Sequence, residues 1–374
     1  MVYRKKVFTL TTIKHIHGGN LWSAAQHYGV NYKEILDFSA NINPLGPVPA
    51  VYDAIKTNLD TMLHYPDPQC LQLKEVLAAW TGLTIDQIIM GNGAAELIYL
   101  LMTTLKPQKV LIPAPTFSEY EAAVQVAGGT VVDFYLPEEH NFKLEAPALA
   151  KQLPGVDMVV ICNPNNPTGQ ILTRDEVLHI VREAAKHHTF VLVDEAFIDF
   201  VPEKEKYSVA SWVKEFSNLF VAYSLTKFLG IPGLRLGAGL GNSQLIKDLN
   251  DRKDPWNVNC LAQIAGISSF DNPDHLKATR NFVYSEKNFL WAELGKINGL
   301  EPFAPSVNYI LIKLTKGWKA KSLQRRLAQF RIMIRDCSSF KNMDDSYIRV
   351  AVKDHSSNLT LIAALKEICG EEER

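Results

Sequence analysis

The stretch YSLTKFLGIPGLRLG, residues 223–237, places Lys227 between hydroxyl groups and an arginine. Ser224 and Thr226 precede the lysine, and Arg235 follows it by eight positions in a segment rich in glycine and proline. Hydroxyl and guanidinium groups can hold a phosphate through charge-assisted hydrogen bonds. A lysine with a lowered pKa can form a Schiff base with a carbonyl group. The stretch therefore suits a ligand that carries both a phosphate and a carbonyl, although taken alone it would be better interpreted as a solvated loop.

Two upstream segments run from apolar strands into polar residues. FVLVDEAFIDF, residues 190–200, begins as a β-branched apolar run and reaches Asp194, which is typical of a buried parallel strand that ends in a carboxylate. VVICNPNNPTG, residues 159–169, likewise runs from a strand into a turn that contains Asn166. Pyridoxal phosphate suits this set, because an aspartate pairs with its ring nitrogen and keeps the ring an electron sink. Singly, Asp194 could be a helix cap and Asn166 a plain Asn-Pro turn.

The three motifs in this order resemble the fold type I pyridoxal phosphate family, to which the aspartate aminotransferases belong, and the resemblance covers nearly the whole chain. It implies an enzyme with pyridoxal phosphate as cofactor. Lys227 would be the catalytic lysine bound to the cofactor, Asp194 the partner of the ring nitrogen and Asn166 the partner of the ring hydroxyl. The implied cofactor-binding residues are Gly93, Ala94, Ala95, Phe117, Asn166, Asp194, Ser224, Thr226, Lys227, Arg235 and Tyr65.

Three further segments fit this resemblance. GNGAAELI, residues 91–98, would begin a helix at the cofactor phosphate, where backbone N–H groups and the helix dipole favour an anion. Ala94 and Ala95 stand where relatives often have a hydroxyl or acidic residue, so this contact would rest on backbone N–H groups. Phe117 matches the aromatic residue that stacks on the ring. Tyr65 matches a tyrosine that reaches the cofactor phosphate of the neighbouring subunit, which implies a homodimer. Phe117 and Tyr65 could each instead be an aromatic residue of the core.

Composition and charge exclude several other classes of protein. The chain has 374 residues, of which 47% are hydrophobic and 21% charged, and its formal net charge is -1; these values are typical of a globular protein of about two domains. Neither a nucleic acid nor a membrane is expected as a partner. The N-terminus lacks the apolar core of a secretory signal, so a cytoplasmic location is the default expectation. Five cysteines without a C-x-x-C pair suggest neither disulfides nor a metal site.

Helical and strand patterns alternate through the middle of the chain, which predicts an α/β fold. The resemblance implies a large domain with a mostly parallel seven-stranded sheet between helices. Ligands of such sheets bind at the carboxyl ends of strands, and Asn166, Asp194 and Lys227 all follow predicted strand ends. The pattern predicts helices at 94–105 and 117–127, and strands at 109–113, 130–135, 156–162, 190–193 and 219–223.

The C-terminal part has a different pattern. A long helical stretch from about Asn281 is followed by VNYILIKL, RIMIRDC and YIRVAVK, whose alternation predicts a smaller α+β domain. We expect an N-terminal segment, 1–46, that packs with this small domain, a large cofactor-binding domain at 47–270, and the small domain at 271–374.

Two arginines, Arg335 and Arg349, lie within these apolar strands. An arginine in such a position is costly unless it meets an anion. A structural ion pair between Arg349 and a nearby aspartate (336, 344 or 345) is one interpretation. In the family, the matching arginine binds the substrate carboxylate through its planar fork.

HGGN (17–20) and LDFSANINPLGP (36–47), together with HYPDP, DEAFIDF and RIMIRDC, resemble the threonine-phosphate decarboxylases of cobalamin biosynthesis. The resemblance implies that L-threonine O-3-phosphate is decarboxylated to (R)-1-amino-2-propanol O-2-phosphate, with serine phosphate as an open alternative substrate. Arg349 is the candidate for the carboxylate and Arg335 for the substrate phosphate. The full set of candidate substrate-binding residues is His17, Asn43, Asn166, Arg335 and Arg349.

Two other functions stay open on the sequence. Histidinol-phosphate aminotransferases share most cofactor motifs, but their pattern usually has tyrosine where this chain has Phe197. A non-catalytic cofactor-binding module, as in some transcription regulators, is disfavoured because Lys227 is kept and a DNA-binding domain is not expected before HGGN.

Overall fold

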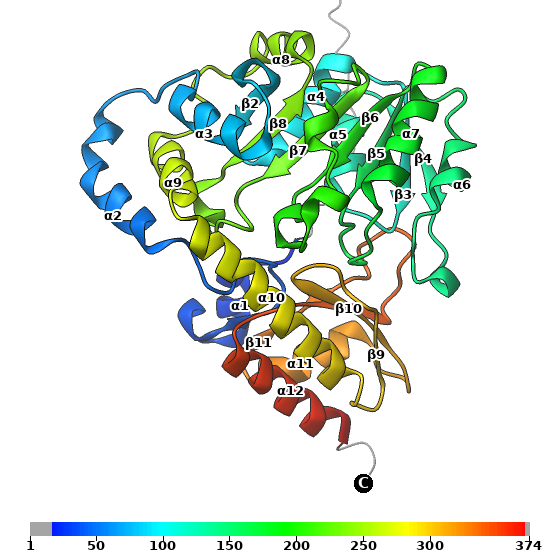
Figure 1. The fold of residues 1–374 in the computed structure, drawn as a ribbon. Helices are drawn as coiled ribbons and strands as arrows, with labels where there is room; N and C mark the ends of the chain where they lie inside the picture. Colours follow the sequence, from blue (N-terminus) through cyan, green and yellow to red (C-terminus); the bar gives the residue numbers. More distant parts are fainter. Residues whose placement is uncertain (1–16, 371–374) are drawn as a thin grey trace, which may run out of the picture.

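The computed structural model describes residues 17–370. Figure 1 shows a large α/β domain and a smaller α+β domain that are joined by the long helix α10 (Pro273–Leu294). The seven strands of the large sheet lie in the order β2-β8-β7-β6-β5-β3-β4, and only β8 runs against the others. The predicted mostly parallel sheet is therefore confirmed. Its strands are β2 (Ile88–Gly91), β3 (Lys109–Ala114), β4 (Thr130–Tyr135), β5 (Met158–Cys162), β6 (Phe190–Asp194), β7 (Leu219–Ser224) and β8 (Gly237–Gly241).

Both faces of this sheet are buried, which explains why its strands read as continuous apolar runs. Successive side chains of a strand point to opposite faces, so Val191 and Val193 pack into one core and Leu192 into the other. The covering helices are α2 (Pro49–Thr57), α3 (Leu71–Thr81), α4 (Ala94–Leu105), α5 (Glu119–Val126), α6 (Ala146–Ala150), α7 (Arg174–Lys186), α8 (Ser243–Asn250) and α9 (Cys260–Phe270).

The small domain is built on a four-stranded antiparallel sheet with the order β12-β13-β10-β9. A short parallel pair, β1 with β11, brings the N-terminal segment onto this domain, and Phe38 is buried in its core. Its other elements are α1 (Leu21–Tyr28), β1 (Leu36–Asp37), β9 (Leu300–Pro302), β10 (Tyr309–Leu314), α11 (Ala320–Ala328), β11 (Ile332–Met333), β12 (Arg335–Asp336), β13 (Tyr347–Ala351) and α12 (His355–Gly370).

Helix α10 connects the two domains physically. It begins at Pro273, before the predicted start near Asn281, because the side chain of Asn272 accepts a hydrogen bond from the N–H of His275 and proline suits the first helical turn. Its first half contributes to the large core and its second half to the small core. The helix therefore links the two domains by packing into both cores.

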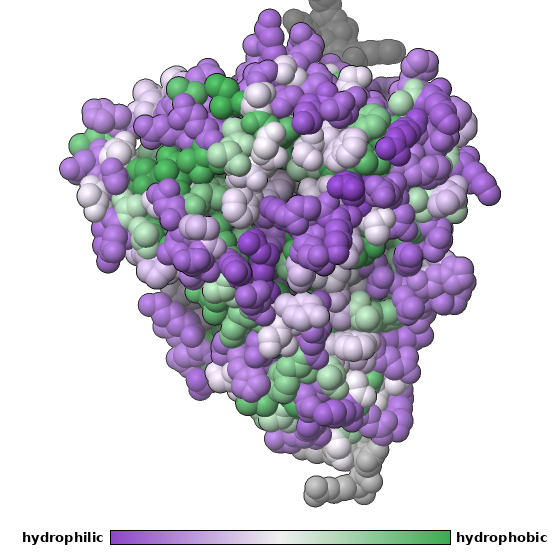
Figure 2. Space-filling model, viewed as in Figure 1, coloured by the Kyte–Doolittle hydropathy of each residue, from purple (hydrophilic) through white to green (hydrophobic). Residues whose placement is uncertain are grey.

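Apolar side chains also gather on one outer face of the large domain. Figure 2 shows hydrophobic residues over α3 and α9. Large hydrophobic side chains that are exposed in the large domain include Met62, Leu63, Tyr65, Leu71 and Trp256. No helix between residues 17 and 370 combines the length and the apolar character that a membrane span requires.

Candidate functional site

A cavity of about 390 Å³ lies where the ends of β5, β6 and β7 face the small domain, and this volume is typical of a small-molecule site. Most of the predicted site residues line it. They are His17, Ala94, Ala95, Phe117, Asn166, Asp194, Ser224, Thr226, Lys227, Arg235, Arg335 and Arg349. The structure thus brings together residues from both domains and from the N-terminal segment. Gly93, Asn43 and Tyr65 are not among the lining residues.

Lys227 lines this cavity and follows the end of β7 by three residues. The pKa of its amine is lowered to about 8, mainly by burial and also by the positive charge of Arg235, while the charge of Asp194 acts in the opposite direction. The amine lies 3.4 Å from the hydroxyl of Thr226, to which it donates. A lysine with this pKa is partly neutral near pH 8 and can act as a nucleophile.

Asp194 ends β6 and faces the same cavity. Its Oδ2 accepts a hydrogen bond from the hydroxyl of Tyr120 at 2.6 Å, and its Oδ1 accepts one from the N–H of Ala196 at 3.0 Å. Burial raises the pKa of Asp194, whereas these two donors and the nearby Lys227 lower it. The donors therefore favour a charged carboxylate at a fully enclosed position, ready to pair with a cation. Tyr120 was not predicted from the sequence.

The opposite end of the cavity is arranged for an anion. Helix α4 begins there, and its N-cap Gly93 makes no side-chain cap. A Cβ atom at Gly93 would lie 2.6 Å from Nη2 of Arg235, and its positive φ of 83° also favours glycine, so the glycine lets the guanidinium approach this turn without shifting. The hydroxyls of Ser224 and Thr226 are 3.0 Å apart beside it. One acidic group, Glu96, lies in the first turn but folds back onto the N–H of residue 92.

The residues of the cavity can be compared with the groups of pyridoxal phosphate that they would hold. Helix N–H groups, two hydroxyls and a guanidinium converge at one end, as a phosphate requires. The carboxylate of Asp194, the amine of Lys227 and the ring of Phe117 line the same cavity. The donor set matches the phosphate, the ring nitrogen and the carbonyl of this cofactor.

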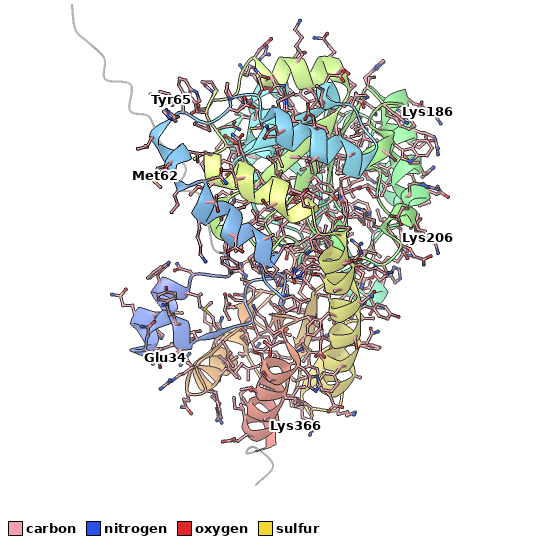
Figure 3. The ribbon with its side chains drawn as sticks, turned by 60° about the vertical axis from the view of Figure 1, so that its left-hand side comes forward. Glu34, Met62, Tyr65, Lys186, Lys206 and Lys366 are labelled. Atoms are coloured by element: carbon pink, nitrogen blue, oxygen red, sulfur yellow. The ribbon has the colours of Figure 1, made fainter. Side chains whose placement is uncertain are left out.

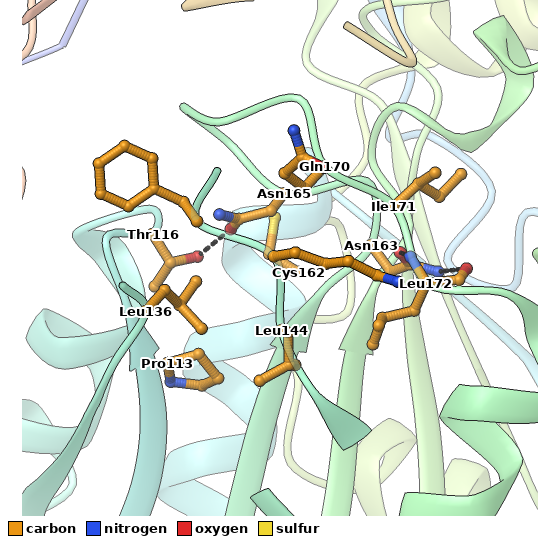
Figure 4. A pocket seen from close by; sticks show the side chains of 12 residues that line it. Pro113, Thr116, Leu136, Leu144, Cys162, Asn163, Asn165, Gln170, Ile171 and Leu172 are labelled. Atoms are coloured by element: carbon orange, nitrogen blue, oxygen red, sulfur yellow. Dashed lines mark hydrogen bonds between the residues drawn. The ribbon is translucent and has the colours of Figure 1, made fainter. Parts of the chain in front are cut away.

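The loop after β5 holds Asn166 in the cavity wall through its neighbours. Figure 4 shows a second, smaller cavity, where the hydroxyl of Thr116 donates to Oδ1 of Asn165 at 2.8 Å. The amide of Asn165 also donates to the carbonyl of Pro115 and to the hydroxyl of Thr168, each at 2.9 Å. Asn165 therefore fixes the loop on one side while Asn166 faces the larger cavity on the other.

Arg349, from β13, is buried at the domain boundary. Its Nη1 donates to Oδ1 of Asn166, and its Nη2 donates to the carbonyl of Ser39 at 2.8 Å. Its Nε has no hydrogen-bond partner among residues 17–370, and burial lowers the pKa of the guanidinium to about 10. The aspartates weighed as ion-pair partners are engaged elsewhere: 336 with Ser338, 344 with Ser346 and 345 with Lys319. The unused donor suits an incoming carboxylate.

Arg335 is the direct cross-strand neighbour of Arg349 in the pair of β12 and β13. Its Nη2 donates to the hydroxyl of Ser339 at 2.8 Å, and its guanidinium lies 5.2 Å from the ring centre of Phe340. Two cations side by side on a buried sheet repel each other, so an anionic ligand between them is favoured.

His17 lies at the cavity rim beside the ring of Phe117, with 5.6 Å between the ring centres. Its Nε2 is 2.8 Å from Oε1 of the buried Glu119, and Tyr99 donates to the other carboxylate oxygen at 2.8 Å. Glu119 and Tyr99 were not predicted to belong to the site. Their link to His17 spans about a hundred residues of sequence, and no local pattern signals it.

Two predicted residues occupy other positions. Asn43 lies behind the turn that carries Lys227, where its amide donates to the carbonyl of Phe228 at 2.9 Å; the expectation that it contacts substrate does not match this position. Tyr65 is 78% exposed and stacks on Trp256, with 4.4 Å between the ring centres. Figure 3 shows Tyr65 and Met62 along one outer edge of the large domain. Met62 is likewise exposed at this edge.

Comparisons with known proteins agree with the fold. The family described as "Aminotransferase class I and II" matches residues 33–365. The chain belongs to this family. Pyridoxal phosphate is thereby implied as its cofactor. The histidinol-phosphate aminotransferase of Sinorhizobium meliloti, solved in complex with pyridoxal-5'-phosphate, shares the fold with a TM-score of 0.85 and 20% identity, covering 95% of each chain.

Several family members are similar along nearly the whole chain. A protein of Caldanaerobacter subterraneus, provisionally named a threonine-phosphate decarboxylase, is 40% identical over 95% of this chain and 94% of its own. The threonine-phosphate decarboxylase of Salmonella typhimurium is 34% identical over 94% of this chain and 96% of its own.

Two solved structures match closely. The histidinol-phosphate aminotransferase of Clostridium acetobutylicum has a TM-score of 0.84 and 31% identity, covering 90% of this chain and 100% of that one. The L-threonine-O-3-phosphate decarboxylase of Porphyromonas gingivalis has a TM-score of 0.80 and 26% identity, covering 88% and 98%.

Proposed function

We propose that the protein is a pyridoxal phosphate-dependent decarboxylase of L-threonine O-3-phosphate, which supplies the aminopropanol linker for cobalamin biosynthesis. The single observation that carries this proposal is the pair of neighbouring buried arginines, Arg335 and Arg349, which face the amine of Lys227 across one cavity. A substrate with a carboxylate and a phosphate presents one anion to each guanidinium. The names of the two most similar relatives cited above support the same substrate.

Bound pyridoxal phosphate supplies an electron sink for the pair left behind when a bond to the substrate α-carbon breaks. Asp194, which accepts hydrogen bonds from Tyr120 and Ala196, would hold the ring nitrogen of the cofactor. Lys227 would hold its carbonyl group. Ser224, Thr226, Arg235 and the first N–H groups of α4 would hold its phosphate.

The residues around the substrate decide which bond breaks. Arg349 can bind the α-carboxylate through its free Nε while its Nη atoms stay bonded to Asn166 and Ser39. Arg335 and His17 would bind the phosphate of the substrate. Fixing both anions holds the carbon–carboxylate bond in one orientation relative to the ring, and orientation of the reacting bond is a large part of catalysis.

We further propose a homodimer in which the apolar edge around Tyr65 is covered by a second copy. A contiguous exposed apolar surface commonly marks a protein interface. In this arrangement Tyr65 would reach the cofactor phosphate of the neighbouring subunit, since it lies outside the cavity of its own.

The proposed function is tested by incubating the cofactor-loaded protein separately with L-threonine phosphate, L-serine phosphate, and histidinol phosphate plus 2-oxoglutarate. We expect CO₂ and an amine phosphate from threonine phosphate without added keto acid. The ratio of rates between the first two substrates measures the preference for one methyl group, which is worth about 1–3 kcal/mol in a pocket. Glutamate from histidinol phosphate, without CO₂, would establish the aminotransferase instead.

A further inference from the structure

We propose that the segment 39–43 sets the distance between Arg349 and Lys227, with Asn43 as a positioning residue. The inference rests on the proposed function, because that function assigns Arg349 to the substrate and Lys227 to the cofactor. At the start of the segment, the carbonyl of Ser39 accepts a hydrogen bond from Nη2 of Arg349 at 2.8 Å. At its end, the N–H of Asn43 donates to the carbonyl of Lys227 at 3.0 Å. Five residues therefore connect the two groups.

The first end is fixed to the small domain. The carbonyl of Phe38 accepts a hydrogen bond from the N–H of Ala351 at 2.8 Å, and its ring is fully buried in the small core. Both the N–H and the hydroxyl of Ser39 donate to Oδ1 of Asp37, at 2.8 and 2.7 Å. A Cβ atom at Gly18 would lie 2.2 Å from the Ser39 carbonyl, so the chain packs tightly there.

The second end is fixed to the turn that carries Lys227 and to helix α10. The side-chain amide of Asn43 donates to the carbonyl of Phe228 at 2.9 Å and to the hydroxyl of Thr279, on α10, at 3.2 Å. Thr279 is fully buried. A Cβ atom at Gly230 would lie 2.6 Å from the carbonyl carbon of Gly46, so this turn also rests directly on the chain that follows Asn43. Asn43 thus joins three segments that are distant in sequence.

The middle of the segment forms part of the cavity wall, through Ala40, Asn41 and Ile42. The two hydrophobic cores and α10 hold both ends of segment 39–43. The length of this segment therefore sets the distance between the guanidinium of Arg349, which binds the carboxylate, and the amine of Lys227. A misplacement of about 1 Å can lower a rate about a hundredfold. Loosening the anchor at Asn43 should therefore slow the chemical step more than it weakens binding.

Three variants test this inference: Asn43→Ala, Thr279→Val, which removes only the acceptor on α10, and Thr279→Ser, which keeps it. The first readout is hydrogen exchange of the amides of residues 225–231 in the cofactor-free protein. We expect exchange about tenfold faster in the first two variants, with wild-type exchange in Thr279→Ser. Asn250→Ala is the matched control, because that amide donates only to Ile246 in α8, away from the cavity.

The second readout is the separation of kcat from KM for threonine phosphate. We expect kcat to fall about tenfold or more in Asn43→Ala and Thr279→Val with a smaller change in KM, and to recover in Thr279→Ser. Wild-type exchange and wild-type kcat in the first two variants would overturn the inference. Faster exchange in those variants, together with a wild-type protein that releases no CO₂, would overturn the proposed function and still support the anchoring role of Asn43.

Discussion

The hydroxyl of Tyr120 donates to Oδ2 of Asp194 at 2.6 Å inside the large domain, where both side chains are buried. This donor stabilises the charged carboxylate against the cost of burial. In Tyr120→Phe we expect the pKa of Asp194 to rise further, because desolvation already raises it and one opposing donor is lost. A hydrogen bond to a charged group contributes about 1.5–3 kcal/mol, so the affinity for pyridoxal phosphate should fall about tenfold or more.

Fluorescence titration of the cofactor-free protein measures that affinity. Tyr135→Phe is the control, since Tyr135 is exposed and only reaches Asp133 at 3.4 Å. Equal affinities in Tyr120→Phe and the wild type would show that Ala196 and Lys227 suffice to keep Asp194 charged.

Lys227 should give the protein a distinct pH dependence of cofactor uptake. Its pKa is lowered to about 8, so the fraction of neutral, nucleophilic amine rises with pH and levels off above that value. Stopped-flow absorbance of the cofactor-free protein mixed with pyridoxal phosphate should show a rate that rises up to about pH 8 and then stays constant. A rate that keeps rising towards pH 10.5, the ordinary lysine value, would contradict the lowered pKa. Lys227→Ala should abolish both covalent uptake and turnover.

Arg349 should matter for substrate and not for cofactor. In Arg349→Met we expect KM for threonine phosphate to rise about thirtyfold or more, because removing one partner of a buried charge pair costs roughly 2–5 kcal/mol. Cofactor content should stay at the wild-type level. Arg331→Met, which breaks an exposed pair with Glu34, is the control and should leave KM unchanged. A variant that loses cofactor or fails to fold would instead indicate that Arg349 mainly serves the structure.

The proposed contribution of Tyr65 across a dimer interface can be tested by mixing two inactive variants. A dimer of Lys227→Ala with Tyr65→Ala would contain one site in which both residues are intact. Mixing after partial unfolding should therefore restore activity to about a quarter of the wild-type value, as expected for random pairing in a twofold-symmetric dimer. Activity that stays at the level of the separate variants would exclude the exchange of Tyr65 between subunits.

Much of the fold and the centre of the site followed from the sequence for a physical reason. The strands before Asn166, Asp194 and Lys227 are short, apolar and separated by helices, and parallel strands bring their carboxyl ends to one edge. The antiparallel pairing that places Arg335 opposite Arg349 was not deduced, although the α+β character of that part was.

Residues that act through contacts between distant segments could not be predicted. Glu119 and Tyr120 lie in a helical pattern that looks like an ordinary core face, and their partners are far away in sequence. Asn43 was expected to contact the substrate. Its side chain instead bonds to the carbonyl of Phe228 and to Thr279 on α10, and neither contact can be deduced from the local sequence. Tertiary packing decides such positions, whereas periodicity reports only which face is buried.

The most direct test of the proposed reaction follows the hydrogen on the α-carbon. Threonine phosphate deuterated at that carbon is incubated with the cofactor-loaded protein in ordinary water, and the amine product is examined by NMR. Breakage of the bond to the carboxylate predicts aminopropanol phosphate that keeps the α-deuterium and gains one hydrogen from solvent, with an equal amount of CO₂. Loss of the deuterium to solvent without CO₂ would mean that the bond to hydrogen breaks instead, which would contradict the decarboxylase and support an aminotransferase.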